Sequence, residues 1–128
     1  MDFLSSNSMM MLEKSMGYLW TKQAAILDNV ANAETPNYKT KVVTFEEKLR
    51  DRLESAGRSQ TPKKDVRDVL ENSEFAVFEA QETTRADDNG VNVTEQTVEL
   101  ARNAYQIQYV QQSISSSLSI LRMAVRGQ

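Results

Sequence analysis

Two stretches of the chain, one near each end, carry apolar residues at alternating steps of three and four, and the middle does not. Such a step averages about 3.5 residues, the period at which helices supercoil around partner helices. The first series, here called the N-terminal seam, consists of Met9, Leu12, Met16, Leu19, Gln23, Ile26, Val30 and Ala33. The second, here called the C-terminal seam, consists of Leu100, Ala104, Ile107, Gln111, Ile114, Leu118, Leu121 and Val125. We expect the following members of the two seams to be helix-packing and assembly residues: Leu12, Met16, Leu19, Ile26, Val30, Leu100, Ile107, Ile114, Leu118, Leu121 and Val125.

The N-terminal seam predicts a helix that begins within residues 5–8 and ends near Asn32. Its end is marked by Pro36, because a proline disfavours helical geometry at the preceding residue, here Thr35. The chain should therefore leave the helix through a tight loop. Within this loop Asn37 is suited to a positive φ, which asparagine tolerates better than most residues.

The C-terminal seam predicts a second helix over Val93–Arg126. Asn92 is its expected N-cap, with Glu95 three residues later as in a capping box, and Gly127 is expected to stop it. At about 1.5 Å per residue this helix is roughly 50 Å long, and the first helix, roughly 40 Å long, fits along most of it. The expected fold is mainly α: long N- and C-terminal helices paired in a coiled-coil-like bundle, with an irregular or extended centre.

The first half of the centre has one clear helical pattern. Lys39–Phe45 is rich in β-branched residues and should be extended. Apolar residues then recur every four positions, which predicts a short amphipathic helix over Phe45–Ser55. Ala56–Lys64 contains glycine, serine and proline and is expected to be a loop. Val66–Asn72 is too short to assign.

The second half of the centre offers a strand and a turn. Phe75–Gln81 is the best strand candidate, and Asp87–Gly90 is a strong turn signal that could return a hairpin. With few large apolar groups, this centre is expected to become ordered only on a partner. We therefore divide the chain into an N-terminal helix (1–35), a charged variable centre (36–91) and a C-terminal helix (92–128).

Charge is concentrated in the centre of the chain. The net charge is −3, and residues 39–90 hold 22 of the 33 charged side chains. A chain that binds phosphates usually shows a basic excess or a basic stripe, and neither is present, so we expect no nucleic-acid partner. The terminal helices instead carry Ser, Gln and Asn on their polar positions. Such residues can be buried against neighbouring helices at a lower desolvation cost than charges. The alternative is an ordinary polar face in contact with solvent.

The residue types that catalytic and metal sites need are largely missing. The chain has no histidine and no cysteine, which excludes disulfides and thiolate metal ligands. It also lacks a Gly-rich phosphate loop and a serine nucleophile elbow. Acidic pairs such as Glu46/Glu47 are adjacent in sequence, which is typical of a solvated charge run. We predict a protein that is not an enzyme, with no cofactor, metal or small-molecule substrate.

The N-terminal region does not have the pattern of a cleaved signal peptide. Asp2 stands where a basic n-region belongs, and the apolar run Met9–Leu12 is too short for an h-region. The longest apolar runs are also too short for a transmembrane helix. If the protein leaves the cytoplasm, we expect a route that keeps its N-terminus.

One segment connects the chain to a known family. Residues 29–38 read Asn-Val-Ala-Asn-Ala-Glu-Thr-Pro-Asn-Tyr, which resembles the signature of the flagellar basal-body rod family, Asn-Ile-Ala-Asn-Ala-x-Thr-Pro-Gly-Tyr at the end of a helix. Val30 stands for the isoleucine and Asn37 for the glycine. The stretches 89–95 and 121–127 are similar to the family as well. The residues that correspond to the motif are Asn29, Ala31, Asn32, Thr35, Pro36, Asn37 and Tyr38.

The resemblance implies a structural subunit of the proximal rod, whose terminal helices pair and stack to transmit torque from the membrane ring to the distal rod and hook. It implies type III export without cleavage of a signal peptide, and a location in the basal-body rod outside the cytoplasmic membrane. The implied partners are other copies of the chain, other rod proteins, a FliE-type adaptor between membrane ring and rod, and the export gate. A soluble helical adaptor or export chaperone of the same secretion system is the alternative.

Overall fold

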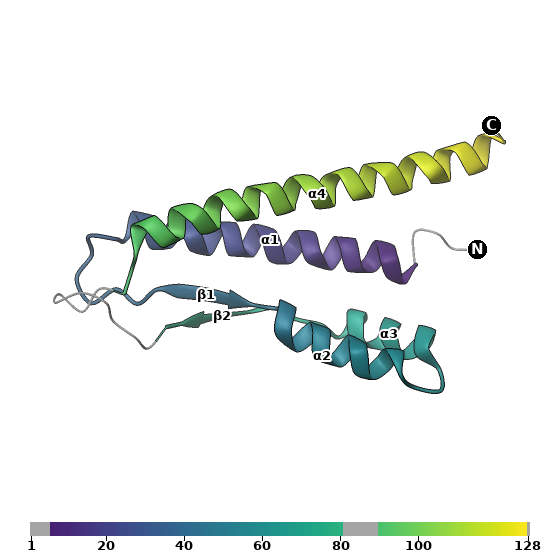
Figure 1. The fold of residues 1–128 in the computed structure, drawn as a ribbon, viewed down its shortest axis with the longest axis horizontal. Coiled ribbons are helices and arrows are strands. Elements are labelled where there is room, and N and C mark those ends of the chain that lie inside the picture. Colours follow the sequence, from purple (N-terminus) through teal and green to yellow (C-terminus); the bar gives the residue numbers. More distant parts are fainter. Residues whose placement is uncertain (1–5, 81–89, 128) are drawn as a thin grey trace.

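The computed structural model describes residues 6–80 and 90–127. It contains, in chain order, α1 (Asn7–Ala31), β1 (Lys41–Thr44), α2 (Glu46–Gly57), α3 (Pro62–Glu71), β2 (Ala76–Glu79) and α4 (Val93–Arg126). Figure 1 shows α4 and α1 running antiparallel side by side, with the β1–β2 pair and the α2–α3 pair on the other side of α1. The mainly α fold with paired terminal helices is therefore confirmed, and α1 is the element that joins the layers.

The caps of both long helices lie close to their predicted positions. The Ser6 side chain accepts a hydrogen bond from the Met9 backbone N–H at 3.3 Å, and α1 follows it. Asn92 does the same for Glu95 at the start of α4, also at 3.3 Å. Gly127 ends α4 with a φ of 70°, a left-handed conformation that glycine adopts without steric cost.

The two seams behave differently in the helix pair. Every member of the N-terminal seam is buried or half-buried. In the C-terminal seam, four members are half-buried and the other four, namely Ala104, Gln111, Leu118 and Val125, are exposed. α4 instead turns a neighbouring stripe toward α1, with Asn103 and Val110 buried and Ile107 and Ile114 beside them. The stripe of α4 that contacts α1 therefore shares Ile107 and Ile114 with the predicted C-terminal seam, but it has Asn103 and Val110 where the seam has Ala104 and Gln111. Ile107 and Ile114 belong to both stripes, so the periodicity alone could not separate them.

The centre differs most from the prediction. Residues 62–71, expected to be partly loop and partly unassigned, form α3. Pro62 occupies the first turn, where its missing N–H costs no hydrogen bond, and Asp65 complements the helix dipole. α3 buries Leu70, which is 1% exposed. An apolar stripe of one and a half turns was too short to detect without this packing.

The two predicted strands pair with each other, although α2 and α3 lie between them in the sequence. β1 and β2 are antiparallel, with Val42 opposite Phe78 and Val43 opposite Val77. The helix expected over Phe45–Ser55 is α2, two residues longer at its C-terminal end. Of the turn predicted at Asp87–Gly90, only Gly90 lies within the described residues.

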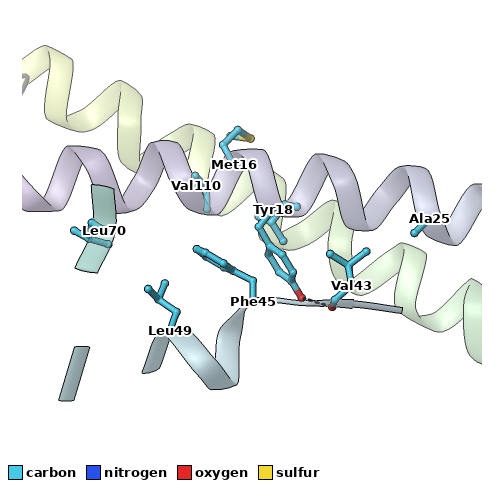
Figure 2. Close-up of a cluster of buried hydrophobic side chains, with 9 residues drawn as sticks. Met16, Tyr18, Ala25, Val43, Phe45, Leu49, Leu70 and Val110 are labelled. Carbon is cyan, nitrogen blue, oxygen red and sulfur yellow. Dashed lines mark hydrogen bonds between the residues drawn. The ribbon is translucent and has the colours of Figure 1, made fainter. Parts of the chain in front are cut away.

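The core lies between α1 and the centre. Tyr18 of α1 stacks on Phe45 with ring centroids 5.2 Å apart, and Phe75 meets Phe45 edge-on at 6.1 Å. Figure 2 shows Leu49 beside Phe45, and Tyr18 reaching the carbonyl of Val43. In the described residues the centre packs its apolar side chains on α1 of the same chain, which supplies apolar surface that the centre lacks by itself. That the centre becomes ordered only on a partner molecule stays a prediction.

Candidate assembly site

Asn29, near the C-terminal end of α1, holds three elements together. Its side chain is 1% exposed. Nδ2 donates to the Lys41 carbonyl and to Gln96 Oε1, both at 2.9 Å. Oδ1 accepts from the Lys41 backbone N–H at 2.8 Å and from the Tyr38 hydroxyl at 3.1 Å. The amide thus bonds β1 as a neighbouring strand would and also reaches α4, and both its donors and its acceptor oxygen are satisfied.

An ion pair lies beside the Asn29 side chain. The Lys41 ammonium hydrogen-bonds the Asp28 carboxylate. This bond lowers the pKa of Asp28 and raises the pKa of Lys41. The Tyr38 hydroxyl also contacts Asp28 Oδ2 at 3.4 Å, and burial together with the nearby carboxylate raises the pKa of Tyr38. The tyrosine is therefore held in its neutral, hydrogen-donating form.

The remaining motif residues shape the loop after α1. Asn32 Nδ2 donates to the Asp28 carbonyl at 2.8 Å, and the Thr35 hydroxyl donates to Asn32 Oδ1 at 3.2 Å. Asn37 has a φ of 58°, as predicted for the position that the family motif gives to glycine. The motif therefore divides into an inward part, which we call the Asn29 corner, and an exposed part. The corner comprises the motif residues Asn29, Asn32 and Tyr38 together with Asp28 and Lys41, which lie outside the motif. The exposed motif residues are Ala31, Thr35, Pro36 and Asn37.

The opposite end of the helix pair is uncovered. Figure 1 shows the C-terminal end of α4 extending past the start of α1. Over these last turns Leu118 is 37% exposed, Ile120 58%, Met123 52% and Val125 79%. A shallow hollow of about 310 Å³ lies between Leu118, Leu121 and Val125, with Arg122 and Arg126 at its edge. Exposed apolar surface of this kind is a candidate site of protein contact.

A larger groove opens between α2 and α4, with α1 as its floor. Its volume is about 710 Å³. Tyr105 and Tyr109 line one wall and are 72% and 74% exposed, and Leu49 and Leu53 line the other. This second surface combines apolar area with hydroxyl groups, a mixture enriched at protein interfaces.

Three contributors were not found from the sequence. Gln96 was not identified as the partner of Asn29, and Trp20 was passed over although it is 59% exposed. Asn103 is 0% exposed, and its Nδ2 donates to the Leu19 carbonyl at 3.1 Å across the α1–α4 interface. Asn103 lies four residues before Ile107 on the stripe that α4 turns to α1, but no signal in the sequence separated it from an exposed asparagine.

Metal-binding side chains do not gather anywhere in residues 6–80 and 90–127 in groups of three or more. In the same residues, no helix has the length and apolarity needed to cross a membrane. The surfaces described above offer packing and hydrogen bonding to another protein.

The terminal helices pair as the resemblance to flagellar basal-body rod proteins implies, and the motif that carries this resemblance lies at the end of α1. The chain is similar to the flagellar basal body rod protein FlgB of Bacillus subtilis (strain 168), with 28% identity over 128 residues, 97% of each chain. No protein-family model matches the chain. The resemblance to the rod proteins, and to FlgB among them, is therefore confirmed.

Proposed function

We propose that this chain is a structural subunit of the flagellar basal-body rod, placed in its proximal part. The observation that carries the proposal is the similarity to FlgB along 97% of the chain. The antiparallel α1–α4 pair supports it, because the end of α4 exposes apolar surface that a neighbouring subunit can cover. Residues 1–35 and 92–128 would form the rod core, and residues 36–91 the variable part.

Torque transmission requires subunits that do not shear internally. The Asn29 corner ties α1 to β1 and α4 through hydrogen bonds of 2.8–2.9 Å. The Lys22–Glu99 ion pair at 3.2 Å and the Asn103–Leu19 hydrogen bond add two further links between α1 and α4. We infer that each subunit turns as a rigid unit and passes torque to its neighbours through the outward residues of the C-terminal seam.

The implied neighbours follow from the same proposal. They are other copies of the chain, other rod proteins, a FliE-type adaptor and the export gate. Export would leave the N-terminus uncleaved, and the assembled protein would lie outside the cytoplasmic membrane.

The test is electron cryotomography of cells that lack the gene, and of the same cells with the gene restored. Basal bodies that stop at the membrane ring, with the rod recovered on restoration, support the proposal. Intact rods in the deletion strain would contradict it and favour the soluble adaptor or export chaperone. Mass spectrometry of the protein in isolated basal bodies tests in the same strains whether its N-terminus is kept.

A further inference from the structure

Five exposed residues follow one face of α1. They are Glu13, Trp20, Ala24, Leu27 and Ala31, here called the Trp20 stripe. From Trp20 onward they are spaced by four, three and four residues, so they lie along one side of the helix. Trp20 is the single tryptophan of the chain and is 59% exposed, and Leu27 is 51% exposed. Large apolar residues that alternate with alanine form holes into which side chains of another helix fit.

A hollow beside Trp20 carries one charge. Its volume is about 470 Å³, and it lies between α1 and α4, where Ile114 forms part of its lining. The other lining residues are Met9, Met16, Gly17, Glu13 and Trp20. Among the described residues, Glu13 makes no ion pair. The hollow is thus an apolar site with an unmatched acid, which favours a basic, apolar occupant.

The end of α4 has that chemistry. Gln111, Ser115, Leu118, Arg122 and Val125 are exposed at steps of four and three, here called the Arg122 stripe. From residue 103 to 128 the only charged residues are Arg122 and Arg126, whereas residues 1–102 carry a net charge of −5. The tail of one copy is therefore attracted to the body of another.

We propose that the Trp20 stripe receives the Arg122 stripe of a second copy of this chain in antiparallel orientation. Arg122 of one copy lies beside Glu13 and Trp20 of the other, where its guanidinium pairs with the carboxylate and stacks on the indole. Leu118 and Val125 cover the apolar surface on either side. This inference rests on the proposed function and names the surfaces through which copies meet in the rod.

The register gives a cross-linking test. If Glu13 lies opposite Arg122, Ala24 of one copy lies opposite Gln111 of the other. Within one chain these residues are far apart, because Leu19 contacts Asn103, which leaves Ala24 and Gln111 offset by roughly 20 Å along the helices. The chain has no cysteine, so Ala24→Cys and Gln111→Cys are clean single-site probes. Ser116→Cys, exposed on another side of α4, is the matched control.

Cells that express the two single-cysteine chains together are oxidised, and their basal bodies are isolated. We expect an Ala24–Gln111 cross-link, with an Ala24–Ser116 cross-link about tenfold weaker, since a disulfide needs Cα atoms within about 7 Å. Basal bodies that contain both chains but show no Ala24–Gln111 cross-link overturn this inference and leave the rod function standing. Absence of the unaltered chain from basal bodies contradicts the rod function itself.

A charge reversal tests the contact independently. Glu13→Arg should lower the cross-link about tenfold, and adding Arg122→Glu should restore it, because the pair is then rebuilt with opposite signs. Adding Arg126→Glu instead should not restore it. Equal restoration by both second changes would show a general charge effect and would overturn the specific pairing.

Discussion

The two ends of the α1–α4 pair are built in opposite ways. Where α1 ends and α4 begins, Asn29 is 1% exposed and its amide groups are hydrogen-bonded within the chain. Where α4 ends, Val125 is 79% exposed and the neighbouring apolar residues are also partly uncovered. The polar groups at the first end are satisfied within the subunit, whereas the second end leaves apolar side chains exposed. The buried part of the motif therefore stabilises the fold of the subunit, and we propose that the exposed C-terminal residues serve assembly.

The largest effect that separates the two ends is expected from Leu118→Asp. A carboxylate in an apolar contact between subunits is costly to bury, so incorporation into the rod should be abolished. Because Leu118 is 37% exposed in the subunit, the free energy of unfolding should fall by only about 1 kcal/mol. Immunoblots of isolated basal bodies and of the culture medium measure incorporation and export, and urea unfolding measures stability.

The control for Leu118→Asp is Ser116→Asp, which adds the same charge two residues earlier on α4 at another exposed position. It should leave incorporation and motility intact. Normal motility with Leu118→Asp would show that the outward C-terminal seam is not an assembly surface.

The closed end should respond in the opposite manner. Asn29→Ala removes four hydrogen bonds and leaves the backbone groups of Lys41 without their partner. We expect the free energy of unfolding to fall by about 3 kcal/mol, since each buried group left unsatisfied costs about 1–3 kcal/mol. Urea unfolding followed by circular dichroism checks this.

Asn37→Gly is the comparison for Asn29→Ala within the same motif. Glycine accepts the φ of 58° at least as well as asparagine, so stability should stay within about 0.5 kcal/mol. If Asn29→Ala were equally mild, the motif would not be the structural closure described above.

The sequence predicts the features that depend on a few adjacent residues, and it does not predict those that depend on contacts between distant residues. Helix caps such as Asn92 and Gly127, and the loop conformation of Asn37, depend on a few adjacent residues and were predicted. α3 was missed because its apolar stripe gains stability only by packing Leu70 into a core made by distant residues. Whether a seam residue such as Leu118 faces inward or outward also depends on how far the partner helix extends.

Buried polar residues show the same limit. Asn29 was identified through the family motif, but its bond to Gln96 spans 67 positions and leaves no local trace. Asn103 contacts Leu19 across 84 positions and sits on a stripe where an apolar residue would be expected. No periodicity distinguishes such a residue from an exposed asparagine.

Asn103 provides a smaller effect that refines the comparison. Unlike Asn29, it makes one hydrogen bond, and its buried Oδ1 has no partner among the described residues. Asn103→Leu should therefore raise the free energy of unfolding by about 1 kcal/mol, because an unsatisfied carbonyl is replaced by apolar volume. Asn103→Ala, which leaves a cavity, should lower it by about 1 kcal/mol. A loss of stability with leucine as large as with alanine would show that the hydrogen bond to Leu19 outweighs the unpaired oxygen.

The smallest effect concerns the pH dependence of the closed end. The hydrogen bond from Lys41 lowers the pKa of Asp28 below 3.8, so folding favours the carboxylate. This contribution is present above the unfolded pKa and is lost as the pH falls through the lowered folded pKa. Asp28→Asn should thus have a lower free energy of unfolding than the unaltered chain at neutral pH. This difference should become smaller once the pH drops below 3.8.

At high pH the same ion pair gives stability the opposite pH dependence, because here stability falls as the pH rises. The pKa of Lys41 is raised above 10.5 by the same hydrogen bond, so its contribution is present below that value and is lost as the pH rises through the folded pKa. Between these acid and alkaline ranges, the difference in free energy of unfolding between Asp28→Asn and the unaltered chain should not change with pH. Asp51→Asn, which removes an exposed carboxylate from α2, controls for net charge.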